Sequence, residues 1–347
     1  MKRCISIFMI MTLCLLSIGC DAQKSTLSTS VKAEDFKPVV LRYANQHPLD
    51  HSATKAAEKA ANFIKEKTEG RVTLDIYPSG QLGDYTQIYD EIMMGNIDIA
   101  HYDVPETYDS RLAASLLPYL AMDASELKKV MGPDSYLAKT VSEIHASFGV
   151  KFLGYNCEGF AGVATNKPVT NPLGIGTDKG VLVRVPPMDV HAIPTIDLGY
   201  RTSTIPYSDT FTSIQTGIVD GWQAGTPSLQ YLYFRDVIKY YYHYKMDQEA
   251  TQIYMNLDKF NTLLPEDQKV LEEAFMEMWI NSMNNIDEED AEYMKKLEDY
   301  GIEVITFTKE EIQPLADYCR DVSFKQLAKL YGENGEEFLD NILSDLK

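Results

Sequence analysis

The residue best suited to bind a ligand in this sequence is Arg184, which lies in a run of otherwise apolar residues, 181–185. The run predicts a strand, and Pro186 and Pro187 end it because proline cannot continue a hydrogen-bonded ladder. A guanidinium is a planar, permanently charged fork that binds a carboxylate through two parallel hydrogen bonds. An arginine at the mouth of a strand therefore indicates an anion-binding site, although a surface ion pair would use the same residue type.

A second candidate for chemistry is the pair His47 and His51, which stand four positions apart with Asp50 between them. On a helix this spacing can hold a metal ion, but Pro48 prevents a helix here and the glutamate of the H-E-x-x-H motif is absent. We therefore expect a solvated loop in this segment, with a bound metal ion as the minor alternative.

Other motifs of enzymes are weak or absent. The glycines of 174–180 do not form a nucleotide loop, because the third glycine comes one place late and a strand, not a helix, follows. Hydrolase elbows, zinc-protease helices and C-x-x-C motifs are also missing, and none of the 51 acidic residues is singled out by its spacing. The sequence favours a binding protein without a cofactor over an enzyme.

Composition sets limits on the partners. The chain has 347 residues, of which 45% are hydrophobic, so it can form two domains or one large one with a true core. Its formal net charge of −19 argues against nucleic acid as a partner, since phosphates require a basic surface. We expect the acidity to serve solubility.

The N-terminus predicts export. Lys2 and Arg3 precede an apolar run, 5–18, and small residues lead to Cys20, as in a secretory signal covering 1–20. The end of this signal resembles a bacterial lipoprotein cleavage site, although Ser17 replaces the usual leucine. We expect a lipid on Cys20 and a flexible tether over 21–37, with secretion without a lipid as the alternative.

The remaining chain alternates strands and helices, as an open α/β sheet requires. The Tyr-rich segment 231–245 is expected to pack in a sheet, and 218–220 to form a short strand. Cys157 and Cys319 are interpreted as two buried thiols, although the sequence does not decide whether they pair. Further strands are expected at 39–44, 72–77, 97–102, 151–156, 159–165, 251–255 and 302–307, and helices at 52–67, 84–94, 124–130, 135–148, 209–216 and 265–297.

Several motifs occur in one order over most of the chain. They are Ile76–Gly83, Gly95–Asp98, Arg184–Pro186, Ile205–Asp209 and Gln215–Gly221. Together they resemble the signature of the solute-binding proteins of TRAP transporters, the DctP type. The resemblance implies a two-lobed periplasmic-binding-protein-like α/β fold with crossover hinge strands and a long bridging helix. Lobe I would comprise 38–157 and 250–285, and lobe II 158–249 and 286–347.

The same resemblance implies that Arg184 binds the carboxylate of an organic acid. Further positions that match ligand-lining sites of the family are Asn45, Tyr85, Asp103, Tyr207 and Gln223. The chain departs from sialate-binding members at Ala161, where they have a second arginine, and at Ala224, where they have asparagine. This departure favours a smaller or more aromatic monocarboxylate, with Phe160, Trp222 and Tyr207 as possible walls.

The resemblance thus implies a receptor in the periplasm that delivers an organic acid to a membrane permease, and the signal at Cys20 predicts that a lipid anchors it to the cytoplasmic membrane. Two alternatives remain, one of them also a binding protein and the other an enzyme. One is a sensory receptor for a chemotaxis or kinase partner, and the other is a secreted hydrolase that uses a pair of cleft carboxylates.

Overall fold

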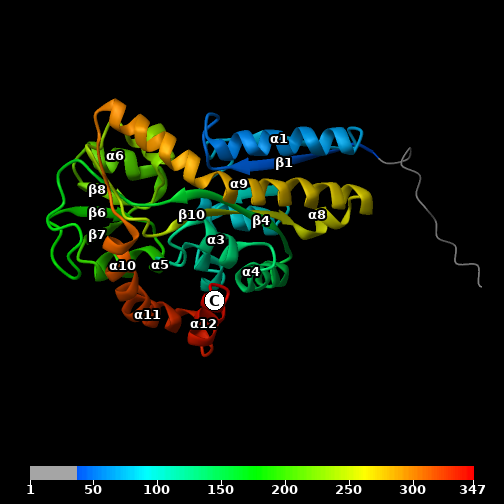
Figure 1. Ribbon diagram of the computed structural model, residues 1–347. Coiled ribbons are helices and arrows are strands. Elements are labelled where there is room, and N and C mark those ends of the chain that lie inside the picture. Colours follow the sequence, from blue (N-terminus) through cyan, green and yellow to red (C-terminus); the bar gives the residue numbers. More distant parts are fainter. Residues whose placement is uncertain (1–36) are drawn as a thin grey trace, which may run out of the picture. The chain divides into compact units, whose positions relative to one another are not determined.

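Two mixed β-sheets organise the chain, each with helices packed on it (Figure 1). The computed structural model describes residues 37–347, so the predicted signal, Cys20 and nearly all of the predicted tether lie outside the described residues. The first sheet has the order β2-β1-β3-β10-β4. Its strands are β1 (Val39–Asn45), β2 (Val72–Tyr77), β3 (Ile99–Tyr102), β4 (Val150–Phe160) and β10 (Gln248–Asn256).

The second sheet has the order β11-β9-β5-β8-β6-β7. The strand β6 that carries Arg184 runs parallel to both of its neighbours, β7 and β8. The strands are β5 (Val163–Thr165), β6 (Leu182–Val185), β7 (Arg201–Thr204), β8 (Gly221–Gln223), β9 (Tyr240–His243) and β11 (Glu303–Thr306).

Two long strands and one long helix connect the sheets. β4 and β10 pair antiparallel with each other in the first sheet, and they lead into β5 and out of β9 in the second. Helix α9 (Pro265–Tyr300) places Phe275 and Trp279 in the cores beside the first sheet and Leu297 in a core beside the second. The two-lobed α/β fold with crossover strands and a bridging helix is therefore confirmed.

The other helices cover the sheets. In the first lobe they are α1 (Ser52–Lys67), α2 (Tyr85–Met93), α3 (Ala124–Met131), α4 (Tyr136–Ser147) and α8 (Leu257–Asn261). The second lobe has α5 (Asp189–Asp197), α6 (Thr210–Gln215), α7 (Pro227–Leu229) and α10 (Lys309–Tyr318). The last helices, α11 (Phe324–Ala328) and α12 (Gly335–Ser344), share a hydrophobic core with α3 and α4, although they belong to the segment 286–347 that was expected in lobe II. Among the helices of residues 37–347, none has the length and apolar character needed to cross a bilayer.

Two local expectations are wrong and one is confirmed. The short strand expected at 218–220 lies instead at Gly221–Gln223, because Ile218 is 62% exposed while Gly221 lies against the backbone of β5, with no room for a Cβ atom. In the Tyr-rich segment only Tyr240–His243 is a strand, and Gln230–Phe234 is a turn of π-helix. Cys157 and Cys319 are buried and free, as expected.

The contact between β4 and α9 depends on a glycine. Gly154 has a φ of +143°, and a Cβ atom there would lie 2.7 Å from Cε3 of Trp279. We expect Gly154→Ala to lower the free energy of unfolding by about 1–3 kcal/mol more than Gly149→Ala does. Gly149 also has a positive φ, but a Cβ atom there would meet nothing within 4 Å, so this variant measures backbone strain alone. Urea denaturation of both variants measures the difference, and equal losses would contradict the packing argument.

Candidate functional site

Parallel strands place the first set of site residues. In β1 and β3, Asn45 is in register with His101, so the loops that follow these strands leave the same edge of the sheet. The loop after β1 carries Gln46 and His47, and Asp103 follows β3 directly. In the second lobe, Arg184 of β6 is in register with Trp222 of β8. The strand pairing therefore brings together residues that are far apart in the sequence.

Residues from both lobes, among them Asp103, Arg184 and Trp222, line one cavity with a volume of about 40 Å³. Ligand pockets for small molecules usually have about 300–1,000 Å³. A solute larger than a few water molecules can therefore enter only if the lobes or the lining side chains move apart. The lining consists of Gln46, His47, Tyr85, Asp103, Arg184, Pro186, Met188, His191, Tyr207, Trp222, Ala224, Leu229 and Glu249.

Arg184 is the buried cation of this cavity, with 1% of its surface exposed. Its Nε donates a hydrogen bond of 2.7 Å to the carbonyl of Ile205, and its guanidinium lies 5.9 Å from the ring centre of Tyr207. Within residues 37–347 no carboxylate lies within 4.0 Å of it. Burial lowers the pKa of Arg184 to about 10, so it stays protonated at neutral pH. A buried charge without an ionic partner is a strong attractor for an anion.

Buried carboxyl groups surround the cavity. Burial raises the pKa of Asp103 to about 7, and it raises the pKa of Glu249 well above its usual value. Asp247 lies behind the lining and accepts a hydrogen bond of 3.0 Å from Gln223, and burial raises its pKa to about 7 as well. These groups hold protons more tightly than exposed acids do, so they can both donate and accept hydrogen bonds near neutral pH.

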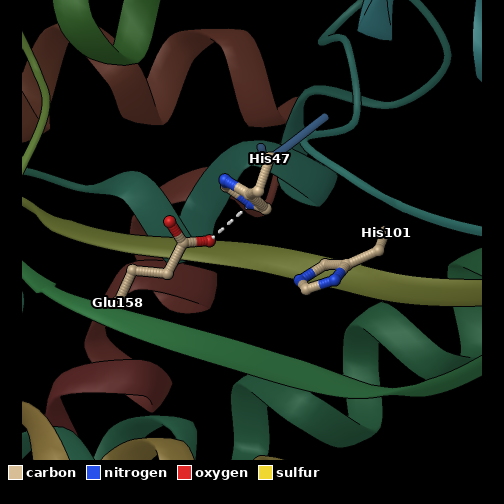
Figure 2. A group of neighbouring side chains, drawn as sticks. All are labelled: His47, His101 and Glu158. Atoms are coloured by element: carbon tan, nitrogen blue, oxygen red, sulfur yellow. Dashed lines mark ion pairs between the residues drawn. The ribbon is translucent and has the colours of Figure 1, made fainter. Parts of the chain in front are cut away.

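The expected solvated loop at His47 and His51 is wrong, because both side chains are buried, at 2% and 0% exposure. Their rings stack with centres 4.5 Å apart. Nε2 of His47 lies 2.9 Å from Oε1 of Glu158 on β4, as the dashed line in Figure 2 shows. Burial lowers the pKa of both histidines to about 3, so both imidazoles are neutral and the contact is no ion pair. No local pattern pointed to this partner, because Glu158 is 111 positions from His47.

The predicted ligand-binding residues divide into two groups. Five line the cavity, namely Arg184, Tyr85, Asp103, Tyr207 and Trp222. The other three are buried beside it: Asn45 bonds Thr54 and the backbone of His47, Gln223 bonds Asp247, and Phe160 donates its backbone N–H to Asp290. Contact of any of these residues with a solute stays a prediction.

Sequence reasoning missed four polar lining residues, Gln46, His47, His191 and Glu249. His191 lies on α5, a helix that was not expected and that contains Pro194. Glu249 lies on β10, which begins three residues before the strand that the alternating pattern indicated. Neither His191 nor Glu249 belongs to a motif. Extending the predicted strand toward its N-terminus would have included Glu249.

Comparison with known proteins gives consistent matches. The model of DctP, the bacterial extracellular solute-binding protein family 7, matches residues 43–329. The sialic acid-binding periplasmic protein of Vibrio cholerae is 22% identical over 298 residues, which cover 83% of this chain and 91% of that protein.

Solved structures have the same fold. A TRAP periplasmic solute-binding protein from Desulfovibrio salexigens with bound orotic acid has a TM-score of 0.80 at 18% identity, covering 88% of this chain and 98% of that one. A second from Haemophilus influenzae with bound L-gulonate has a TM-score of 0.77 at 20% identity, covering 88% and 99%.

The buried Asp247 predicts a pH dependence of stability. Its folded-state pKa of about 7 lies above the unfolded value of about 3.9, so the folded state holds the proton more tightly. The free energy of unfolding should therefore fall as pH rises from about 4 to about 7, by up to about 1.4 kcal/mol per pH unit for this group. Asn imitates the protonated carboxyl, so we expect a shallower slope in Asp247→Asn. Urea denaturation from pH 5 to 8 measures the slope of the free energy of unfolding against pH. An unchanged slope in the variant would show that Asp247 does not cause the pH dependence.

Proposed function

The chain belongs to family 7 of the bacterial extracellular solute-binding proteins, the DctP family, and from this premise we propose that it is the periplasmic receptor of a TRAP-type transporter. It captures an organic acid between its two lobes and delivers it to a membrane permease. Proteins of this family bind solutes and do not transform them, so the hydrolase alternative falls away. The sensory receptor remains the alternative, because a signalling partner would use the same capture step.

One observation supports this function most strongly: Arg184 is a buried, protonated arginine on the cavity wall, with no carboxylate of residues 37–347 within 4.0 Å. An isolated buried charge costs several kcal/mol of stability. The carboxylate of a solute would offset this cost by forming two parallel hydrogen bonds with the guanidinium. Of the five donor N–H groups, the bond to Ile205 uses the one on Nε, which leaves those on the terminal nitrogens for the solute.

The rest of the cavity favours a monocarboxylate with groups that donate hydrogen bonds. Asp103 and Glu249 line the cavity and can accept hydrogen bonds from hydroxyl groups of a solute. Tyr207 and Trp222 offer aromatic surfaces with ring centres 6.2 Å apart. Among residues 37–347, Arg184 is the only arginine that lines the cavity, so one carboxylate is the expected anionic group. Gulonate and orotate, which the related structures hold, are acids of this general kind.

Capture must be coupled to movement of the lobes, because the cavity of about 40 Å³ is too small for such an acid. An open form would admit the solute, and contacts from both lobes would then favour closure. The permease would recognise the closed form. The solute shifts the equilibrium between the open and closed forms because it binds the closed form more tightly, and no covalent bond is made or broken.

We also propose that Cys20 carries a lipid that holds the receptor at the outer face of the cytoplasmic membrane. The support is the apolar run 5–18 followed by small residues and Cys20. A lipid would keep an otherwise soluble receptor near its permease.

The lipid anchor predicts a change of cell fraction. In cells that express the full chain, we expect the protein in the membrane fraction, and Cys20→Ala to move it to the soluble periplasmic fraction or to leave its signal uncleaved. Incorporation of a radioactive fatty acid measures lipidation directly. We expect Cys20→Ala to lose the label and the control variant Cys157→Ala to keep it. Export of the unlabelled wild-type chain would show secretion without a lipid.

Arg184 provides the test of the carboxylate receptor. A panel of aliphatic, aromatic and sugar acids is screened by thermal unfolding, where a ligand at a hundred times its dissociation constant adds about 2.7 kcal/mol. We expect at least one acid to raise the melting temperature of the wild type and to leave that of Arg184→Ala unchanged. Arg201→Ala is the matched control, since Arg201 lies on the neighbouring strand β7 and is exposed.

Circular dichroism of Arg184→Ala shows whether the variant is folded, and Arg184→Met keeps most of the side-chain volume if it is not. Undiminished affinity of the same acid for a folded Arg184 variant would contradict the assignment.

A further inference from the structure

Three side chains with metal-binding atoms meet on the first sheet, near the solute cavity. His47 follows β1, His101 lies on β3 and Glu158 lies on β4, and Figure 2 shows the three side chains, with His47 joined to Glu158 by the dashed line. One ligand atom of each lies within 4.8 Å of the others, and all three residues are buried. The strand order β1-β3-β10-β4 explains how residues 47, 101 and 158 come together.

Two buried polar atoms of these residues, Nε2 of His47 and Oε2 of Glu158, form no hydrogen bond within the described residues. A buried polar atom without a partner is destabilising. Nε2 of His47 does lie 2.9 Å from the other oxygen of Glu158, but this contact does not have the geometry of a hydrogen bond. The two residues thus present an imidazole nitrogen and a carboxylate at the separation of neighbouring ligands of one ion.

We propose that His47, His101 and Glu158 form a binding site for a divalent transition metal ion, with Zn²⁺ as the preferred ion. Two imidazole nitrogens and one carboxylate oxygen are the ligand set of zinc sites that keep one coordination position open. Since His47 also lines the solute cavity, the ion lies beside that cavity.

Binding requires a small contraction of the cluster. Two ligands at about 2.1 Å from one zinc ion are at most about 4.2 Å apart, whereas the atoms here span up to 4.8 Å. The hydroxyl of Thr251 now bridges the gap, at 2.9 Å from Nε2 of His101 and 2.6 Å from Oε1 of Glu158. A metal ion takes over this bridging position when the hydroxyl turns to the carbonyl of Asn156, which lies 3.4 Å away.

Neighbouring residues can hold the ligands in place. The hydroxyl of Tyr43 lies 3.0 Å from Nδ1 of His101, so the imidazole can donate from Nδ1 to Tyr43 and present Nε2 to the metal. Nδ1 of His51 accepts a hydrogen bond from the backbone of Ala53, so its Nε2 carries the proton. That nitrogen lies 3.4 Å from the hydroxyl of Ser228 and 3.7 Å from Oε2 of Glu158, and because it carries the proton it is not a fourth ligand.

The test is calorimetric titration of the chelator-treated protein with Zn²⁺ alone, without any solute. We expect one ion per chain, and a dissociation constant at least a hundredfold higher in His47→Gln and Glu158→Gln. Tyr43→Phe should raise it about tenfold, as loss of an outer hydrogen bond to a metal-bound histidine does. Because no solute is present, the result is independent of the proposed transport function.

His145 supplies the matched control. It is buried like His101, with Nδ1 at 2.9 Å from the hydroxyl of Tyr89 and Nε2 at 2.8 Å from Oε1 of Gln252, but it lies outside the cluster. We expect His145→Gln to bind Zn²⁺ as the wild type does. If a cluster variant does not fold, the visible absorption of Co²⁺ added to the wild type reports nitrogen ligands directly. The proposal is overturned if the wild type binds no stoichiometric Zn²⁺, if the cluster variants bind it undiminished, or if Co²⁺ shows only its aqueous spectrum.

Discussion

The structure depends on the burial of a positive charge between two lobes. Arg184 is 1% exposed and is held by the carbonyl of Ile205, a neutral acceptor that does not cancel its charge. Acidic side chains lie near the cavity, but none within residues 37–347 comes within 4.0 Å of the guanidinium to form an ion pair. An Asp or Glu side chain paired with Arg184 would occupy the anion site and compete with the solute. The lobes therefore keep the guanidinium desolvated and without an ionic partner. An anion that binds there becomes its ionic partner and offsets the cost of burying the charge.

The same burial determines the state of the surrounding groups. It raises the pKa values of Asp103 and Asp247 to about 7 and lowers the pKa of His191 to about 3. Nδ1 of His191 lies 3.5 Å from Oδ2 of Asp247. In water the two side chains would form an ion pair, but their burial favours the neutral form of each. The cavity consequently presents one fixed charge and several groups that can change between donor and acceptor. Such a lining suits a solute with one anionic end and a hydroxylated remainder.

The sequence predicted the parts of the site that depend on local pattern. Arg184 was recognisable because alternating residues and two prolines define its strand, and Tyr207 because it stands in a motif with Pro206 and Asp209. His47 and Glu158 could not be connected in this way, because their contact depends on the order of β1, β3, β10 and β4 in the sheet. Local periodicity carries no information on which strands become neighbours. The loop at His47 was predicted as solvated for this reason, since burial there comes from strands at 99–102 and 150–160.

The crossover strands have two structural roles. β4 and β10 join the lobes, and they also carry Glu158, Thr251 and Glu249 beside the cavity. Their register shifts between Glu249 and Ala250, next to these residues, and a shift of this kind bends and twists a strand pair. The lobe closure proposed above would act on this same irregular stretch. Because a packed strand pair cannot twist without moving its side chains, such a closure would also move the acidic groups.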